Sequence, residues 1–260
     1  MSRPAPPRRP LGPVPAVIVA ALLGAPAGAQ PPALVVSVAA SLADVMSELA
    51  RRHEQATGQT VRLNVGGSNH LARQIVEGAG ADLFVSADDA QMDVVERAGR
   101  LVPGSRVALL TNRLVVVGRP GGRLRTGDAA ALASPSVRRL ALGNPDSVPA
   151  GVYARRWLEG QGAWTAIAPR VVPTVTVRAA LAAARAGRVE AAVVYATDAA
   201  TEPTLPVLYQ VPAADAPDIV YPAAVVAGPR QDAAGRFLAY LRSAEAGAVF
   251  TTAGFGVAGR

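Results

Sequence analysis

A strand that turns abruptly into a helix sets a pattern that recurs along this sequence. In residues 34–53, LVVSVAASLADVMSELARRH, a β-branched run is followed by two small residues and then by Ser41. From Leu42 onward, apolar side chains recur three and four residues apart, which is the period of a helix. The pattern predicts Ser41 as the N-cap, with Asp44 in the place of a capping-box acid. Such a junction can bind an anion, because first-turn N–H groups are unpaired.

The same junction recurs at two further places along the chain. Residues 60–65 alternate as a strand, and after two glycines Ser68 opens a helix. Residues 139–142 form a strand before a helix whose first position suits Pro149, since no N–H is needed there. Ala150 then offers a free N–H in the first turn. The alternation of strands and helices predicts an α/β protein with doubly wound, parallel sheets.

A fourth junction and one terminal tyrosine complete the set. Residues 171–176 are strand-like and Val177 opens a helix, while the buried strand 191–195 ends in Tyr195. Ligands of open α/β sheets bind beyond the carboxyl ends of the strands, where these positions lie. The candidate binding residues are therefore Ser41, Ser68, Ala150, Val177 and Tyr195.

The valine-rich strand at residues 114–117 divides the four helix starts two and two. This division predicts two lobes, each a mainly parallel sheet with helices on both faces, closing on a small anion. Strand 221–226 is expected to return to the first lobe, so the chain should cross between lobes twice, near residues 112–117 and 216–223. The predicted lobes are residues 30–114 plus 222–260, and residues 115–221.

Residues 1–29 are predicted to be a secretory signal peptide. A basic start containing Arg3, Arg8 and Arg9 precedes the apolar residues 14–23, and Ala-Gly-Ala at residues 27–29 suits cleavage. Mature protein should then begin near residue 30. No later stretch is apolar for long enough to cross a bilayer.

The amino-acid composition limits the kinds of partner that this protein can bind. The chain has no cysteine, so we expect neither disulfides nor a lipid anchor. We therefore expect the exported protein to be free in a periplasm. The formal net charge is +7, of which three positive charges lie in the predicted signal peptide. The remaining arginines are scattered without interleaved aromatics, which argues against nucleic-acid binding. His53 and His70 are too isolated to form a metal site.

Each candidate also has a purely structural interpretation. Ser41 could simply cap its helix, and Tyr195 could be a core tyrosine with a satisfied hydroxyl. Ala150 and Val177 could be plain helix-face residues. These alternatives stay open on the pattern alone.

The charged residues near the junctions have expected roles of their own. We expect Arg73 and Arg178 to face solvent or pair with aspartates, since a fixed cation would blunt discrimination between anions by size. Asp44 and Asp88 are expected to be structural.

Several stretches together make the chain resemble the periplasmic molybdate-binding proteins of ABC transporters along its mature length. They are AASL at 39–42, LARQI at 71–75, ADLFVSAD at 81–88, NRLVVV at 112–117, GNPDSVPAGVYA at 143–154, VRAAL at 177–181, VVYATDA at 193–199 and YPAAVV at 221–226. The resemblance implies the two-lobed periplasmic-binding-protein fold of type II.

The same resemblance implies that neutral donors from both lobes hold a tetrahedral oxyanion. Carried over, these donors are the hydroxyl and N–H of Ser41 and Ser68, the N–H of Ala150 and Val177, and the phenol of Tyr195. Molybdenum would be held only as its oxyanion, with no side chain on the metal and no cofactor. Gly66 and Gly67 depart from the family pattern, since many relatives have side chains there, and leave the donor set around Ser68 open.

The implied function is a monomeric receptor that captures molybdate, and also tungstate, and delivers it to a membrane permease with a cytoplasmic ATPase. Two alternatives remain. One is an exported enzyme of the same fold that isomerises a tricarboxylic acid, in the manner of an aconitate isomerase; it would need a general base that the five positions do not supply. The other is a receptor for sulfate or phosphate.

Overall fold

The computed structural model describes residues 1–2, 32–124 and 127–258. The chain divides into two units, Met1–Gln30 and Pro31–Arg260, and the helices and strands described below belong to the second. The predicted signal peptide and its cleavage site thus fall almost entirely outside the described residues. Among the described residues, no helix combines the length and the apolar character needed to span a bilayer.

Six strands form the first sheet. They are β1 (Leu34–Ala39), β2 (Val61–Gly66), β3 (Leu83–Val85), β4 (Val107–Thr111), β10 (Val220–Val225) and β11 (Gly256–Val257). Their order in space is β11-β4-β10-β3-β1-β2. Strand β1 pairs in parallel with β2 and β3, whereas β10 pairs antiparallel with β3 and β4.

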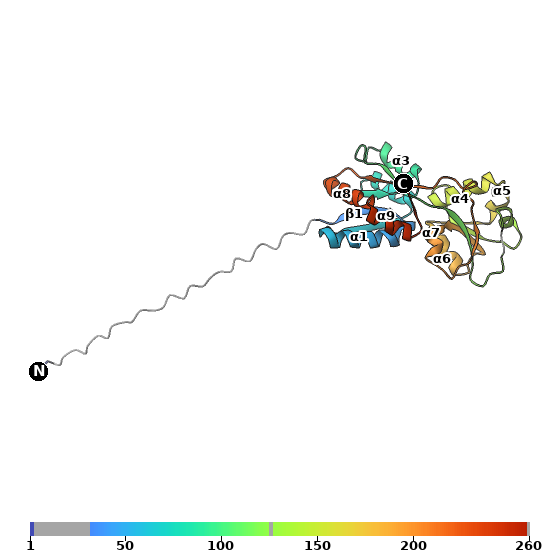
Figure 1. The fold of residues 1–260 in the computed structure, drawn as a ribbon, viewed down its shortest axis with the longest axis horizontal. Helices are drawn as coiled ribbons and strands as arrows, with labels where there is room; N and C mark the ends of the chain where they lie inside the picture. Colours follow the sequence, from blue (N-terminus) through green and yellow to red (C-terminus); the bar gives the residue numbers. More distant parts are fainter. Residues whose placement is uncertain (3–31, 125–126, 259–260) are drawn as a thin grey trace. The chain divides into compact units, whose positions relative to one another are not determined.

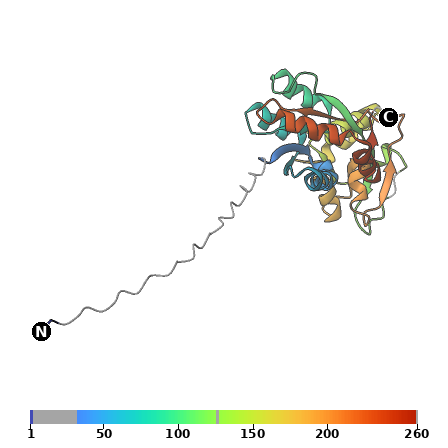
Figure 2. The ribbon, with the colours of Figure 1, turned by 60° about the vertical axis from the view of Figure 1, so that its left-hand side comes forward.

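Helices cover both faces of this sheet and with it make the first lobe. They are α1 (Ala43–Thr57), α2 (Ser68–Val76), α3 (Asp89–Arg97), α8 (Gln231–Leu241) and α9 (Ala244–Thr252). Successive strand side chains point to opposite faces. Leu83 and Val85 accordingly join the core under α1, α8 and α9, while Phe84 joins a separate core under α2 and α3. The C-terminal helices thus return to the N-terminal elements (Figure 1, Figure 2).

Five strands form the second sheet, in the order β7-β6-β8-β5-β9. The strands are β5 (Leu114–Gly118), β6 (Leu140–Gly143), β7 (Val171–Thr174), β8 (Ala191–Tyr195) and β9 (Val207–Gln210). The helices of this second lobe are α4 (Pro149–Gly160), α5 (Trp164–Ile167), α6 (Val177–Arg185) and α7 (Ala196–Ala200). Three short 3₁₀ helices complete the two lobes: η1 (Ala40–Leu42), η2 (Ala130–Ala133) and η3 (Ala168–Arg170).

The α/β class is confirmed, with one correction: the sheets are mixed where mainly parallel ones were expected. Strand β5 pairs antiparallel with β8 and β9, as β10 does with β3 and β4. Strands β5 and β10 are the ones that directly follow the two crossings between sheets. Each is antiparallel to both of its neighbours, so each sheet contains both kinds of pairing.

The crossings lie between β4 and β5 and between β9 and β10. The two crossings run side by side. The N–H of Asn112 in the first crossing donates to the carbonyl of Ile219 in the second at 3.3 Å. Leu114 pairs within the second sheet and Tyr221 within the first. The lobe boundaries predicted after residues 114 and 221 therefore both lie slightly earlier in the chain. The strands β4, β9 and β11 and the helices α5 and α7 were not predicted.

Candidate anion-binding site

A small cavity lies where the two lobes meet, with a volume of about 20 Å³. It is lined by the ends of β1, β2 and β8 and by the starts of the helical segments that follow β1, β2, β6 and β7. All five predicted binding residues line it: Ser41, Ser68, Ala150, Val177 and Tyr195. The fold therefore brings together residues that are far apart in the sequence, two from the first lobe and three from the second.

Three α-helices begin at this cavity. In each, the first N–H that donates to a backbone carbonyl lies beyond the predicted residue: His70 follows Ser68, Gly151 follows Ala150, and Ala180 follows Val177. The amides of the three predicted residues thus belong to the first turn, where the helix supplies no acceptor and its dipole adds positive charge. Together they form a site suited to an anion shared by both lobes.

The predicted N-cap at Ser41 is wrong. The 3₁₀ helix η1 intervenes, α1 begins at Ala43, and its N-cap Leu42 makes no side-chain capping bond. Asp44 does not cap either, and it pairs instead with Arg178 of the second lobe. The buried Ser41 hydroxyl lies 3.1 Å from the Tyr221 hydroxyl.

Ser68 opens α2 as predicted, with Gly67 as the N-cap. Its buried Oγ accepts a hydrogen bond from the Ala87 N–H at 3.0 Å. A hydroxyl has one proton and two lone pairs, so accepting this bond leaves the proton of Ser68 to donate. The bond also holds Oγ in place against β3 and its following loop.

Tyr195 ends β8 and is only 1% exposed, yet its hydroxyl has no hydrogen-bond partner among the described residues. Leaving a buried polar group unpaired costs about 1–3 kcal/mol, which a ligand oxygen would offset. Burial raises the pKa of Tyr195 well above 10, with further contributions from Tyr221 and Tyr153. The phenol therefore stays protonated and can act only as a neutral donor to an anion.

Gly67 explains how closely the lobes approach at the site. A Cβ atom built on Gly67 would lie 2.8 Å from the carbonyl oxygen of Val175 in the second lobe. The φ angle of Gly67 is −68°, so glycine is required here for space and not for backbone conformation. The departure noted in the sequence therefore permits a tight lobe–lobe contact beside the cavity.

Among the described residues that line the cavity, none carries a charged side chain. Arg178 is paired with aspartates, as expected: it bonds Asp44 across the lobes and Asp198 within its own. Arg73 is exposed and lies 3.8 Å from Glu77. The charge of a bound anion would thus be met by neutral donors alone.

The other singled-out residues have structural places. Asp88 caps α3 by accepting from the Gln91 N–H at 3.0 Å, and burial raises its pKa to about 6. His53 is buried against the rings of Phe237 and Tyr240. In the part of the chain that the structure describes, no three potential metal-ligating side chains gather.

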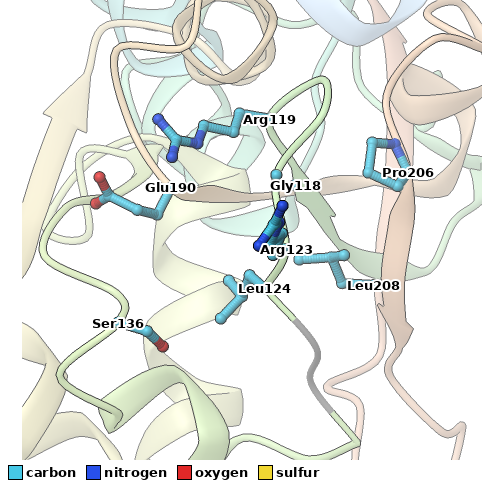
Figure 3. A pocket seen from close by; sticks show the side chains of 9 residues that line it. Gly118, Arg119, Arg123, Leu124, Ser136, Glu190, Pro206 and Leu208 are labelled. Carbon is cyan, nitrogen blue, oxygen red and sulfur yellow. The ribbon is translucent and has the colours of Figure 1, made fainter.

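A second, larger cavity of about 300 Å³ lies wholly within the second lobe (Figure 3). Arg119, Arg123 and Glu190 contribute charged side chains to it, and Ser136 a hydroxyl. None of the five predicted residues lines this cavity, and no helix start does. It therefore lacks the features that distinguish the cavity between the lobes.

Sequence reasoning missed three polar residues around the site. Thr176 lines the cavity and caps α6 by accepting from the Ala179 N–H at 3.1 Å. Tyr221 lies behind Ser41 within hydrogen-bond distance of it, and Asn112 donates to Tyr221. Thr176 could have been recognised as a helix cap from its type and place, whereas only the packing of strands brings Tyr221 and Asn112 to Ser41.

Two α/β lobes that share a small cavity of neutral donors define a solute-binding protein. The chain belongs to the bacterial extracellular solute-binding protein family, whose model matches residues 34–256. This membership confirms the two-lobed fold expected from the resemblance.

Individual relatives span nearly the whole chain. The "Molybdate-binding protein ModA" of Escherichia coli is 34% identical over 226 residues, which cover 85% of this chain and 88% of that protein. The "Putative ABC transporter substrate-binding lipoprotein YvgL" of Bacillus subtilis is 33% identical over 224 residues, 85% of each chain. The solved periplasmic molybdate-binding protein of Azotobacter vinelandii superimposes with a TM-score of 0.76 at 26% identity, over 85% of this chain and 98% of that one.

Proposed function

We propose that this protein is an extracytoplasmic receptor that captures molybdate, and also tungstate, between its two lobes. The observation that carries the proposal is the cavity itself, which is lined by first-turn residues from both lobes and by Tyr195, whose buried hydroxyl has no hydrogen-bond partner among the described residues. The names of the molybdate-binding relatives support the ligand class. The donors proposed are Ser41, Ser68, Ala150, Val177 and Tyr195.

Size is the basis proposed for selectivity. Sulfate and molybdate are both tetrahedral dianions at neutral pH, so neither shape nor charge separates them. Molybdate is larger, and donors carried on rigid helix starts and strand ends fit one anion size. A smaller anion leaves some donors too far for a hydrogen bond yet stripped of water, at about 1–3 kcal/mol for each. Two such donors already amount to several tenfold steps in affinity.

The receptor is proposed to be a monomer that delivers its oxyanion to an ABC permease with a cytoplasmic ATPase. We also propose that the signal peptide is cleaved near residue 29 and that the protein is free in the periplasm. Without a cysteine, the chain has no residue for the thioether-linked lipid of a bacterial lipoprotein. Binding and release, with no chemical step, would suffice for this role.

A ligand panel tests the proposal. Purified mature protein is titrated calorimetrically with molybdate, tungstate, sulfate, phosphate and citrate. We expect molybdate and tungstate to bind within about tenfold of each other, and sulfate and phosphate at least a thousandfold more weakly. Sulfate binding as tight as molybdate binding would overturn the size argument. Preferential binding of citrate would favour the enzyme alternative, which the uncharged lining of the cavity opposes.

A further inference from the structure

A buried chain of polar groups stands behind Ser41, outside the cavity lining. The Tyr221 hydroxyl lies 3.1 Å from Ser41 Oγ. Asn112 Nδ2 donates to the same Tyr221 hydroxyl at 3.2 Å and to Thr197 Oγ1 at 2.8 Å. Ser41 and Tyr221 are both buried, so the bond between them is shielded from water, while the two bonds of Asn112 are partly buried.

The direction of each hydrogen bond follows from the chemistry of the groups. Asn112 Oδ1 accepts from the Arg113 N–H at 2.8 Å, which identifies the other end of the amide as the NH₂ group. An NH₂ group only donates, so Tyr221 Oη must accept from Asn112. Among the described residues, Ser41 Oγ is the one recorded acceptor within reach of the Tyr221 proton, and we assign Tyr221 as the donor in this pair. Ser41 consequently receives a hydrogen bond from behind and keeps its own proton for the cavity.

These hydrogen-bonded residues come from both lobes and from a crossing between them. Asn112 lies in the first crossing between the lobes, and Thr197 belongs to α7 of the second lobe. Tyr221 belongs to β10 of the first lobe, and its ring lies against that of Tyr195, with centroids 5.7 Å apart. Tyr221 thus holds one proposed donor by a hydrogen bond and contacts another from the opposite lobe.

We propose that Tyr221 and Asn112 are positioning residues that hold the Ser41 hydroxyl with its proton toward the bound oxyanion. This inference rests on the proposed function and concerns the same site. Without the bond from Tyr221, the Ser41 hydroxyl can rotate and present lone pairs to the anion. Fixing its direction in advance removes that cost from binding.

Removing one oxygen atom tests the proposal. In Tyr221→Phe the ring remains, so its contacts with Tyr195 and Phe255 are retained. We expect molybdate affinity, measured by calorimetry, to fall about tenfold, the scale of one hydrogen bond to a charged group. Tyr240→Phe is the control, since its hydroxyl bonds Glu245 at 3.4 Å in an exposed place, and it should bind like the parent.

A double-mutant cycle separates positioning from a general structural role. If Tyr221 acts through Ser41, Tyr221→Phe should have little further effect in the Ser41→Ala background. The same holds for Asn112→Asp, whose carboxylate would draw the Tyr221 proton away from Ser41. This second variant keeps the proposal testable if Tyr221→Phe folds poorly, which unfolding without ligand would reveal.

The outcomes are distinct. Binding of molybdate by the parent with unchanged affinity in both variants would overturn this inference alone. So would an equal loss with and without the Ser41 hydroxyl, because the residues would then act on the whole fold. Failure of the parent to bind molybdate or tungstate would overturn the proposed function and this inference with it.

Discussion

Arg178 of α6 spans the junction between the lobes to reach Asp44 of α1, with Nη2 and Oδ2 2.8 Å apart. The same guanidinium bonds Asp198, a fully buried carboxylate of its own lobe. Burial raises the pKa of Asp198 to about 6, although the positive charge of Arg178 opposes that rise. One cation therefore stabilises a buried acid and also ties the lobes together.

Removing the cross-lobe partner should weaken closure slightly. The Asp44 side chain is 68% exposed, so its link to Arg178 is worth at most about 1 kcal/mol. We expect Asp44→Ala to reduce molybdate affinity about twofold to fivefold at low salt, and less at high salt. Asp232→Ala is a matched control, because Asp232 also lies in the first turn of a first-lobe helix. Equal affinities of Asp44→Ala and the parent at low salt would contradict this role.

Adding one methyl group at Gly67 should prevent full closure. The new Cβ would lie 2.8 Å from the Val175 carbonyl oxygen of the other lobe, closer than real Cβ contacts. We expect Gly67→Ala to lower molybdate affinity about fivefold to a hundredfold, since overpacking costs about 1–3 kcal/mol. Gly80→Ala, where a Cβ meets nothing within 4 Å, is the control. Parent-like binding by Gly67→Ala would mean that the lobes do not need this contact.

Tyr195→Phe should lower the affinity for molybdate without lowering the stability of the unliganded protein. The variant loses a donor to the anion, so we expect molybdate affinity to fall about tenfold to a hundredfold. It also removes a buried hydroxyl that has no partner among the described residues, so the unliganded protein should unfold at the same temperature or a higher one. Calorimetry and thermal unfolding measure the two effects, with Tyr209→Phe, on β9 of the same lobe, as the control. A clear loss of stability without ligand would make Tyr195 a structural residue.

Asp88 should make stability depend on pH. Burial raises its pKa to about 6 in the folded protein from 3.8, so folding favours the protonated form. Its stabilising contribution is therefore complete below about pH 4 and is lost as pH rises through about 6. The side-chain amide introduced by Asp88→Asn would stay neutral at every pH and could still cap α3.

The unfolding temperature of Asp88→Asn relative to the parent should accordingly rise between pH 4 and pH 7.5. The full difference corresponds to about 2–3 kcal/mol. Asp232→Asn, which makes the same substitution at an exposed position of α8, is the control. A relative stability of Asp88→Asn that is constant or falls with pH would contradict the prediction.

Local pattern predicted much of this protein, because neighbouring residues decide where a strand stops and a helix starts. The change of period at Ser41, the proline before Ala150 and the apolar spacing after Ser68 and Val177 each located a junction correctly. Parallel strands place such junctions at one edge of a sheet, and the five candidate residues do line one cavity. The assignment of the cap at Ser41 failed, since η1 inserts a turn that no nearby residue type announces.

Only the tertiary structure decided which residues contact the binding residues from behind and which contacts join the two lobes. The antiparallel entry of β5 and β10, the reach of Arg178 to Asp44, and the bond of Tyr221 to Ser41 all join residues distant in sequence. Such contacts depend on how the sheets pair and how the lobes pack, and hydrophobic period within a segment carries no information about either. The sequence alone thus determined the elements and where a ligand could bind, while packing determined the direction of the donors and the closeness of the lobes.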